Sequence, residues 1–100
     1  MNENQYSYIT LAAPTTTTIA TRPVILSGIT INKATANGVI TIYDGIDAAT
    51  GTIIAIITSP ATLLQNQVSH NFFDIRLKKG LTIVTSTAAQ DITVCYRPTA

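Results

Sequence analysis

Short runs of β-branched and aromatic residues alternate along this chain with clusters of Gly, Pro, Asn and Asp, and no segment keeps a helical period. Runs of this kind, separated by turn residues, are typical of antiparallel strands in a sandwich or barrel. We expect eight strands, at Gln5–Ala12, Thr16–Thr21, Val24–Lys33, Val39–Asp44, Thr52–Thr58, Val68–Leu77, Leu81–Thr85 and Asp91–Arg97. The pattern predicts an all-β fold, an antiparallel β-sandwich or jelly-roll of about eight short strands.

Turn residues refine this picture at three places. Asn37-Gly38 tolerates positive φ and therefore predicts a hairpin between the third and fourth strands. Lys79-Gly80 marks another turn. In the third strand the apolar positions change parity at Ser27-Gly28, which predicts a bulge or bend there. The best helix candidate is Ala61–Gln67, about two turns long, and a loop is the alternative for this segment.

Alternation assigns the faces of the strands, because successive side chains point to opposite sides of a sheet. In the last strand it places Ile92, Val94 and Tyr96 toward the core. In the sixth strand it separates two sets of residues. One set comprises Phe73, Ile75 and Leu77, and the other comprises Val68, His70, Phe72, Asp74 and Arg76.

The run Thr52–Thr58 is apolar on both faces, so this strand is either central to a packed sheet or part of a subunit interface. With no helices to cover the outer face, the interface is the preferred interpretation. We therefore expect Ile54, Ile56 and Phe72 to contribute to a contact with other subunits or with a shell.

The N-terminal segment has two interpretations. Tyr6 and Tyr8 share one face if it forms a strand, and an edge strand is a template for pairing with another chain. A loosely attached arm is the equal alternative. We expect a single domain with residues 1–22 as an N-terminal arm with the first strands and residues 23–100 as the core of one β-sandwich.

The composition narrows the class of protein. Only 11% of residues are charged, 46% are hydrophobic, and there are 18 threonines and 15 isoleucines. A soluble monomer usually has a more charged surface, so we expect partners to cover part of this one. The alternative is a wet, uncharged threonine-rich surface. Clustered Lys and Arg, the footprint of a nucleic-acid partner, are confined to Arg76, Lys78 and Lys79 beside a turn, and we expect no nucleic acid.

The chain begins with a polar segment and has no apolar run long enough for a membrane helix, so we expect no signal peptide, no membrane contact and synthesis in the cytoplasm. The only histidine is His70, which lies too far along its strand from Asp74 for a direct hydrogen bond, and Cys95 is the only cysteine. Asp44, Gly45 and Asp47 offer too few oxygens for a calcium loop and are expected to form a turn. We therefore expect no catalytic residues, no metal and no cofactor.

Five motifs follow one another in a characteristic order: Val24-Ile-Leu-Ser-Gly-Ile, Val39-Ile-Thr-Ile-Tyr-Asp-Gly, Gly51-Thr-Ile-Ile-Ala, Gly80-Leu-Thr-Ile-Val and Asp91-Ile-Thr-Val-Cys-Tyr-Arg-Pro. In this order they resemble small β-sandwich structural proteins of tailed bacteriophages, over about residues 6–97.

The resemblance implies a structural virion protein without enzyme activity. The expected role is a capsid decoration, or cement, protein on the outer surface of the head, which binds the major capsid protein and copies of itself, most often as a homotrimer. The alternative is a tail or fibre component that acts as a receptor- or glycan-binding module.

Overall fold

The computed structural model describes residues 7–11, 16–33, 35–59, 68–86 and 90–99. These ranges hold eight strands and no helix. The strands are β1 (Ser7–Leu11), β2 (Thr16–Ala20), β3 (Val24–Lys33), β4 (Val39–Asp44), β5 (Thr52–Thr58), β6 (Val68–Leu77), β7 (Leu81–Ser86) and β8 (Asp91–Pro98). Within the described ranges there is accordingly no helix that could span a membrane.

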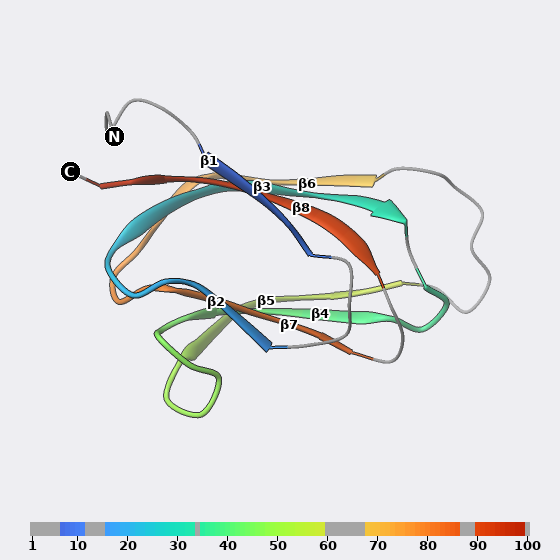
Figure 1. Cartoon of the computed structure of the whole chain (residues 1–100), viewed down its shortest axis with the longest axis horizontal. Helices are drawn as coiled ribbons and strands as arrows, with labels where there is room; N and C mark the ends of the chain where they lie inside the picture. The colour runs from blue at the N-terminus through green and yellow to red at the C-terminus, as the bar shows by residue number, and fades with distance from the viewer. Residues whose placement is uncertain (1–6, 12–15, 34, 60–67, 87–89, 100) are drawn as a thin grey trace.

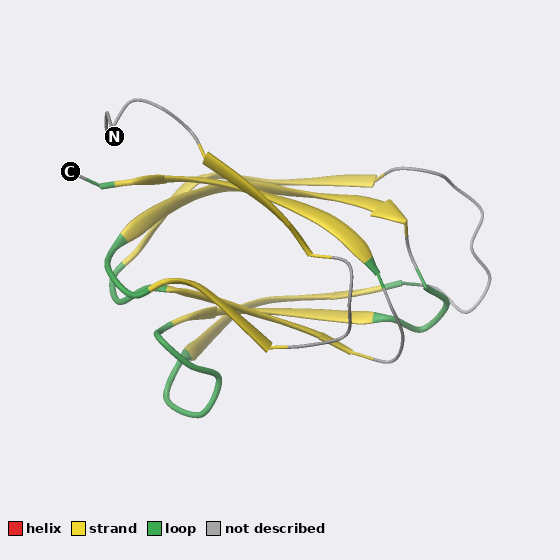
Figure 2. Cartoon of the chain, viewed as in Figure 1, coloured by secondary structure: helices red, strands yellow, loops and turns green. Residues whose placement is uncertain are grey.

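The strands form two four-stranded antiparallel sheets that stack as two layers (Figures 1 and 2). Sheet A has the order β1-β8-β3-β6, and sheet B has the order β2-β7-β4-β5. Four of the pairings are nested, because β1 pairs with β8, β2 with β7, β3 with β6 and β4 with β5. Nested pairs of eight strands wrapped into two sheets define a jelly-roll, so the predicted fold class is confirmed.

This topology sets which strands share an open side of the sandwich. Short links join β3 to β4 and β7 to β8, so these strands face each other across the core. The last strand of sheet A, β6, and the last strand of sheet B, β5, are therefore the edge strands of one side. We call this side the β5–β6 edge.

Inward-facing aliphatic residues of both sheets fill the core. The buried set is Val24, Leu26, Ile29, Ile31, Ile40, Ile42, Leu77, Leu81, Ile83, Ile92 and Val94. In β8, Ile92 and Val94 are buried and Tyr96 packs against the core, as alternation predicts. The core is thus built almost entirely from stiff β-branched residues and leucine, which suit a pleated, buried surface.

The predicted bulge at Ser27-Gly28 is confirmed, because the register of β3 shifts between Leu26 and Gly28 against both β6 and β8. Only glycine fits at position 28. A Cβ there would lie 2.8 Å from the carbonyl oxygen of His70 on β6. The bulge turns the apolar face of β3 from even to odd positions and so keeps Leu26 and Ile29 in the same core.

The hairpin predicted at Asn37-Gly38 is wrong. A turn does form there, with Asn37 at φ 62° and the Gly38 N–H donating to the Thr35 carbonyl oxygen at 2.8 Å. It links two strands that lie in different sheets, since β3 belongs to sheet A and β4 to sheet B. Turn chemistry is local, whereas the partner of each strand is decided by distant segments. The predicted turn at Lys79-Gly80 likewise passes from sheet A to sheet B, between β6 and β7.

The alternation assumed for the sixth strand is wrong in its middle. Phe73 and Asp74 have φ of 53° and 58°, in the left-handed region that interrupts a regular strand. Four steps along β6, from Asn71 to Ile75, oppose only two along β3. Phe72 therefore packs against the core, and Phe73 points away from it.

The fifth strand is the edge of sheet B and not a central strand. Its register with β4 shifts between Ile42 and Tyr43, which leaves Ile54 as an extra residue. This bulge brings Ile54 to the core together with Ala55 and Ile57. Regular alternation along Thr52–Thr58 predicts Ile54 on the same face as Ile56, and that prediction is wrong because of the bulge.

At the N-terminus, residues 7–11 form the edge strand β1, which pairs with β8. Of the two interpretations of this segment, the strand is therefore correct for these residues. Tyr6 and the helix candidate Ala61–Gln67 lie outside the described residues.

Candidate interaction surface

Two large isoleucines of β5 face the solvent. Ile53 and Ile56 lie on the outer face of sheet B and are 51% and 58% exposed. Their cross-strand neighbours on β4 are Tyr43 and Thr41. Full burial of an isoleucine is worth roughly 1.5–3 kcal/mol, so leaving both in water forgoes a stabilisation that a partner could recover.

The edge strand β6 of sheet A also exposes apolar side chains. Phe73 is 84% exposed and Ile75 is more than one third exposed. The backbone that presents the Phe73 ring is in the left-handed region, and its N–H donates to the Asn71 Oδ1 at 2.6 Å. A left-handed conformation costs a residue with a Cβ about 1–2 kcal/mol, so the ring is held outward against a local energetic preference.

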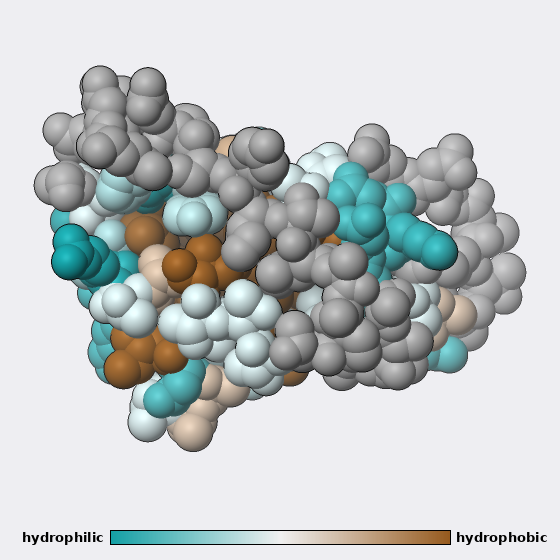
Figure 3. All heavy atoms as spheres, viewed as in Figure 1, coloured by the Kyte–Doolittle hydropathy of each residue, from teal (hydrophilic) through white to brown (hydrophobic). Residues whose placement is uncertain are grey.

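Of the five exposed large apolar residues in the described ranges, four belong to the β5–β6 edge, and the fifth, Ile46, lies in the loop between β4 and β5. No charged residue occurs in β5, and on β6 the charged residues are Asp74 and Arg76. Figure 3 shows the opposite side of the sandwich, with β1 and β2 in front, where apolar side chains reach the surface between neutral and hydrophilic ones. Exposed apolar side chains on edge strands are typical of interaction surfaces, and here Ile53 and Ile56 belong to sheet B whereas Phe73 and Ile75 belong to sheet A.

The structure separates the residues that the sequence singled out for an interface. Ile56 lies on the exposed outer face of β5. Ile54 and Phe72 are partly buried and pack against the core. Tyr8 belongs to β1, at the opposite end of sheet A, where it pairs with Cys95. Sequence alternation missed Phe73, because its exposure follows from a backbone conformation that the residue types do not reveal.

The neighbouring phenylalanines of β6 give a sharp prediction. Replacing Phe73 with Gly should raise the free energy of unfolding by about 0.5–1 kcal/mol, because relief of the left-handed strain exceeds the entropy that glycine adds to the unfolded chain. Replacing Phe72 with Ala should lower it by about 2 kcal/mol, because its ring packs against the core. Urea unfolding of both variants tests this. Equal destabilisation by the two would contradict the assignment of their faces.

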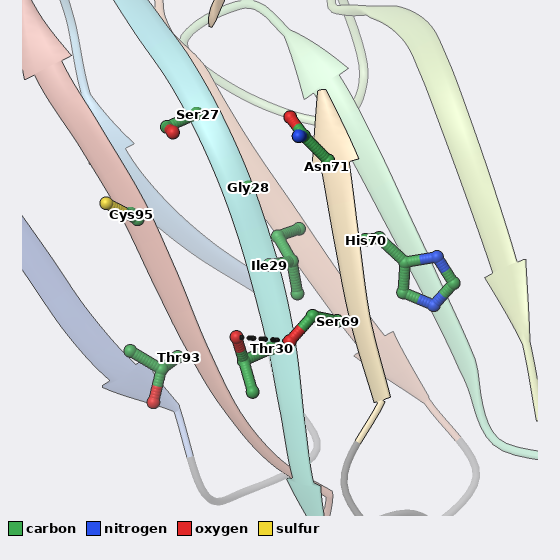
Figure 4. Close-up of a pocket in the computed structure, with 9 residues that line it drawn as sticks. All are labelled: Ser27, Gly28, Ile29, Thr30, Ser69, His70, Asn71, Thr93 and Cys95. Carbon is green, nitrogen blue, oxygen red and sulfur yellow. Dashed lines mark hydrogen bonds between the residues drawn. The ribbon is translucent and has the colours of Figure 1, made fainter. Parts of the chain in front are cut away.

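A second surface feature is a shallow polar depression on the outer face of sheet A, with a volume of about 270 Å³ (Figure 4). Its side chains come from three adjacent strands, β8, β3 and β6. Thr30 and Ser69 share a hydrogen bond of 3.1 Å across it. The lining is Ser27, Gly28, Ile29, Thr30, Ser69, His70, Asn71, Thr93 and Cys95. The polar side chains that line it carry hydroxyls, an amide and a thiol, so the depression offers neutral hydrogen-bonding groups.

His70 and Cys95 do not form a catalytic pair in this structure. They lie on the two strands that flank β3, and the imidazole of His70 points away from Cys95 (Figure 4). Two strand spacings separate their backbones by roughly 10 Å. Within the described residues no group of three His, Cys, Asp or Glu side chains is placed to hold a metal ion.

Asp44 at the end of β4 and Asp47 in the loop that follows it both accept hydrogen bonds from groups of the protein itself. The Asp44 carboxylate accepts hydrogen bonds from the backbone N–H groups of Lys78 and Lys79, at 3.0 and 2.9 Å, and from that of Gly80 at 3.4 Å. Asp47 Oδ1 accepts from the N–H and hydroxyl of Thr50 at 2.8 and 2.7 Å. The predicted turn is thus present, and Asp44 ties it to the turn between β6 and β7.

These contacts set the acidity of Asp44. Partial burial by itself raises the pKa of the carboxyl, but the three backbone hydrogen bonds and the charge of Lys79 outweigh it and hold the pKa below its ordinary value of 3.8. Hydrogen bonds from Thr50 likewise lower the pKa of Asp47. Since the folded pKa of each carboxyl lies below the unfolded one, the associated stability is present above about pH 4 and is lost as the pH falls through the folded value.

Replacing Asp44 with Asn should therefore lower the free energy of unfolding at pH 7 by about 1 kcal/mol, because neutral acceptors bind backbone N–H groups more weakly than a carboxylate. The variant should also lose less stability than the wild type between pH 5 and about pH 3. Urea unfolding at several pH values measures both effects. Asp91→Asn is the control, because it also removes one carboxylate. An unchanged acid dependence in Asp44→Asn would contradict the role of this carboxylate.

Comparison with known proteins finds one similar solved structure and no matching family. No protein-family profile matches the sequence, and no curated protein matches it. Among solved structures, the chain is similar to one described as Bacillus endospore appendages that form a family of disulfide-linked pili. The identity is 18% and the TM-score 0.44, and the match covers 99% of this chain and 96% of that chain. A likeness at this level does not establish a shared function.

Proposed function

We propose that this chain is a structural virion protein, a cement protein that decorates the head of a tailed phage by binding the major capsid protein and copies of itself. The observation that carries the proposal is the β5–β6 edge, where Ile53, Ile56, Phe73 and Ile75 are exposed on two edge strands. A protein whose task is to bury surface against a shell benefits from an apolar edge with few charges to desolvate.

The fold is compatible with this role. Jelly-rolls occur in viral capsid proteins, and also in lectins, so the architecture supports the proposal only by analogy. The sequence motifs that resemble small phage structural proteins point in the same direction. The proposal places the protein on the outer surface of the capsid and assigns it no catalytic step, cofactor, nucleic acid or membrane.

The polar depression on sheet A favours a second candidate, a receptor- or glycan-binding module of a tail or fibre. Its hydroxyl and amide groups match the hydrogen-bonding groups of a neutral sugar. Asn71, which lines the depression, also accepts the hydrogen bond from the N–H of the exposed Phe73. An exposed aromatic ring next to neutral polar groups could bind such a ligand.

Deletion of the coding sequence from the phage that encodes it distinguishes these functions. For a cement protein, heads still assemble and adsorb to cells, but they release DNA at a lower temperature, and added purified protein restores the wild-type release temperature. For a receptor-binding module, heads keep their thermal stability and fail to adsorb. Particles with unchanged heat stability would overturn the cement function.

A further inference from the structure

The free edge of β5 lacks most of the features that keep edge strands from pairing with other chains. In the described part of the chain β5 pairs only with β4 and is the outermost strand of sheet B. Its sequence, Thr52–Thr58, contains no charged residue, no Pro and no Gly. Natural edges usually carry a Lys, a Pro or a bulge that prevents pairing, and β5 has only the bulge at Ile54.

Two other edges differ from it in what they expose. Strand β6 carries Asp74 and Arg76 and is broken by two residues at positive φ. Strand β2 has a register shift of its own, and its exposed positions are Thr16 and Thr18. Strand β5 therefore combines an uncharged edge with large exposed apolar side chains.

A second copy of this chain is the partner that fits such an edge. Strand β5 has no charge to be matched by a complementary partner, and the net charge of the chain is only +1, so two copies repel each other weakly. Beyond the bulge, the strand alternates regularly. Ile56 and Thr58 lie on the outer face, and Ala55 and Ile57 lie on the core side.

An antiparallel two-fold arrangement satisfies this alternation for residues 55–57 when its axis passes through Ile56, and regular pairing ends where Thr58 meets the bulged Ile54. Residues directly opposite each other in a sheet share a face. The axis at Ile56 sets Ile56 against Ile56 on the outer face. On the core side it sets the large Ile57 against the small Ala55, so all three pairs agree in face.

We propose that β5 pairs with β5 of a second copy, antiparallel about a two-fold axis at Ile56, and joins two sheets B into one eight-stranded sheet. This inference rests on the proposed function, since it supplies one contact between copies in the decorated particle. One short edge buries less than the roughly 800 Å² per partner of a stable interface, so the pairing is reversible and depends on concentration when the protein is free in solution.

Cysteine cross-linking tests the register. In a Cys95→Ser background, Ile56→Cys places two thiols opposite each other at the axis, within the Cα separation of about 4.4–6.8 Å that a disulfide spans. Ile53→Cys is the matched control, because Ile53 is similarly exposed on the same outer face. Its two copies lie six strand positions apart in this arrangement, or roughly 20 Å.

Under mild oxidation, Ile56→Cys should form a covalent dimer at least tenfold faster than Ile53→Cys. Equal rates, or no dimer from Ile56→Cys, would overturn the pairing. Sedimentation of the wild type against Ile56→Lys provides a second readout without cysteine, and dimerisation unaffected by the lysine would also overturn it. A chain that is abundant in particles but does not cross-link at position 56 would refute this edge contact and leave the cement function standing.

Discussion

Replacing Ile42 with Ala should lower the free energy of unfolding by about 2–5 kcal/mol, whereas the same replacement at Ile56 should change it by less than about 0.5 kcal/mol. Ile42 is fully buried on the inner face of β4, where it pairs with Ala55 and Ile83. Its removal leaves a cavity that close-packed neighbours fill only in part. A domain of this size has a total stability of roughly 5–15 kcal/mol, so the loss is a large fraction of it.

Ile56 is the matched comparison because the chemistry of the substitution is identical and only the burial differs. Guanidinium unfolding of both variants measures the difference, and an unchanged m-value shows that the change lies in stability and not in the unfolded state. If Ile56→Ala destabilised the chain as much as Ile42→Ala, Ile56 would be a core residue, and the interaction surface would lose its central member.

The second large effect concerns assembly. The double variant Ile53→Lys with Ile56→Lys should keep the fold, because both side chains are more than half exposed. It should bind to particles at least tenfold more weakly than the wild type, because two apolar contacts are lost and two charges must be desolvated. Binding of purified variants to particles that lack the chain measures this effect.

The control for this experiment is a pair of lysines outside the β5–β6 edge. Thr21→Lys with Ala49→Lys adds the same charge at exposed positions of the turn after β2 and of the loop between β4 and β5. If both double variants lose binding equally, net charge and not the apolar edge governs attachment. If neither loses binding, the β5–β6 edge does not touch the particle.

Local sequence patterns were sufficient to define most strands. The ranges Val24–Lys33, Val39–Asp44, Thr52–Thr58 and Val68–Leu77 were predicted with the bounds that the structure has. Runs of β-branched residues between turn residues are a local signal, and strand formation responds to it. The bulge at Ser27-Gly28 was also predicted from the sequence, because the apolar positions change from even to odd numbers at a glycine.

The pairing of the strands could not be predicted from local sequence patterns. The Asn37-Gly38 turn looks like a hairpin turn, yet it leads from sheet A to sheet B. Which strand pairs with which depends on contacts between residues far apart in sequence. Among the eight described strands, β4 and β5 are the one consecutive pair that forms a hairpin within a sheet, joined by the loop that Asp44 and Asp47 stabilise.

The exposed apolar residues of the β5–β6 edge were predicted in part. Ile56 was identified because β5 is apolar on both faces, but a single bulge moved Ile54 to the core, and nothing in the residue types locates that bulge. The exposure of Phe73 depends on two non-glycine residues at positive φ. Asn71, whose side chain accepts the Phe73 N–H, and Asp74, one of the two residues at positive φ, are of residue types typical of such turns.

The central claim is that this chain belongs to the shell of a virus particle, and its copy number in the particle tests that claim most directly. Quantitative mass spectrometry of purified particles gives the ratio of this chain to the major capsid protein. The cement function predicts a ratio of the same order as one. A few copies per particle would favour the tail or fibre component, and the absence of the chain from particles would contradict the account.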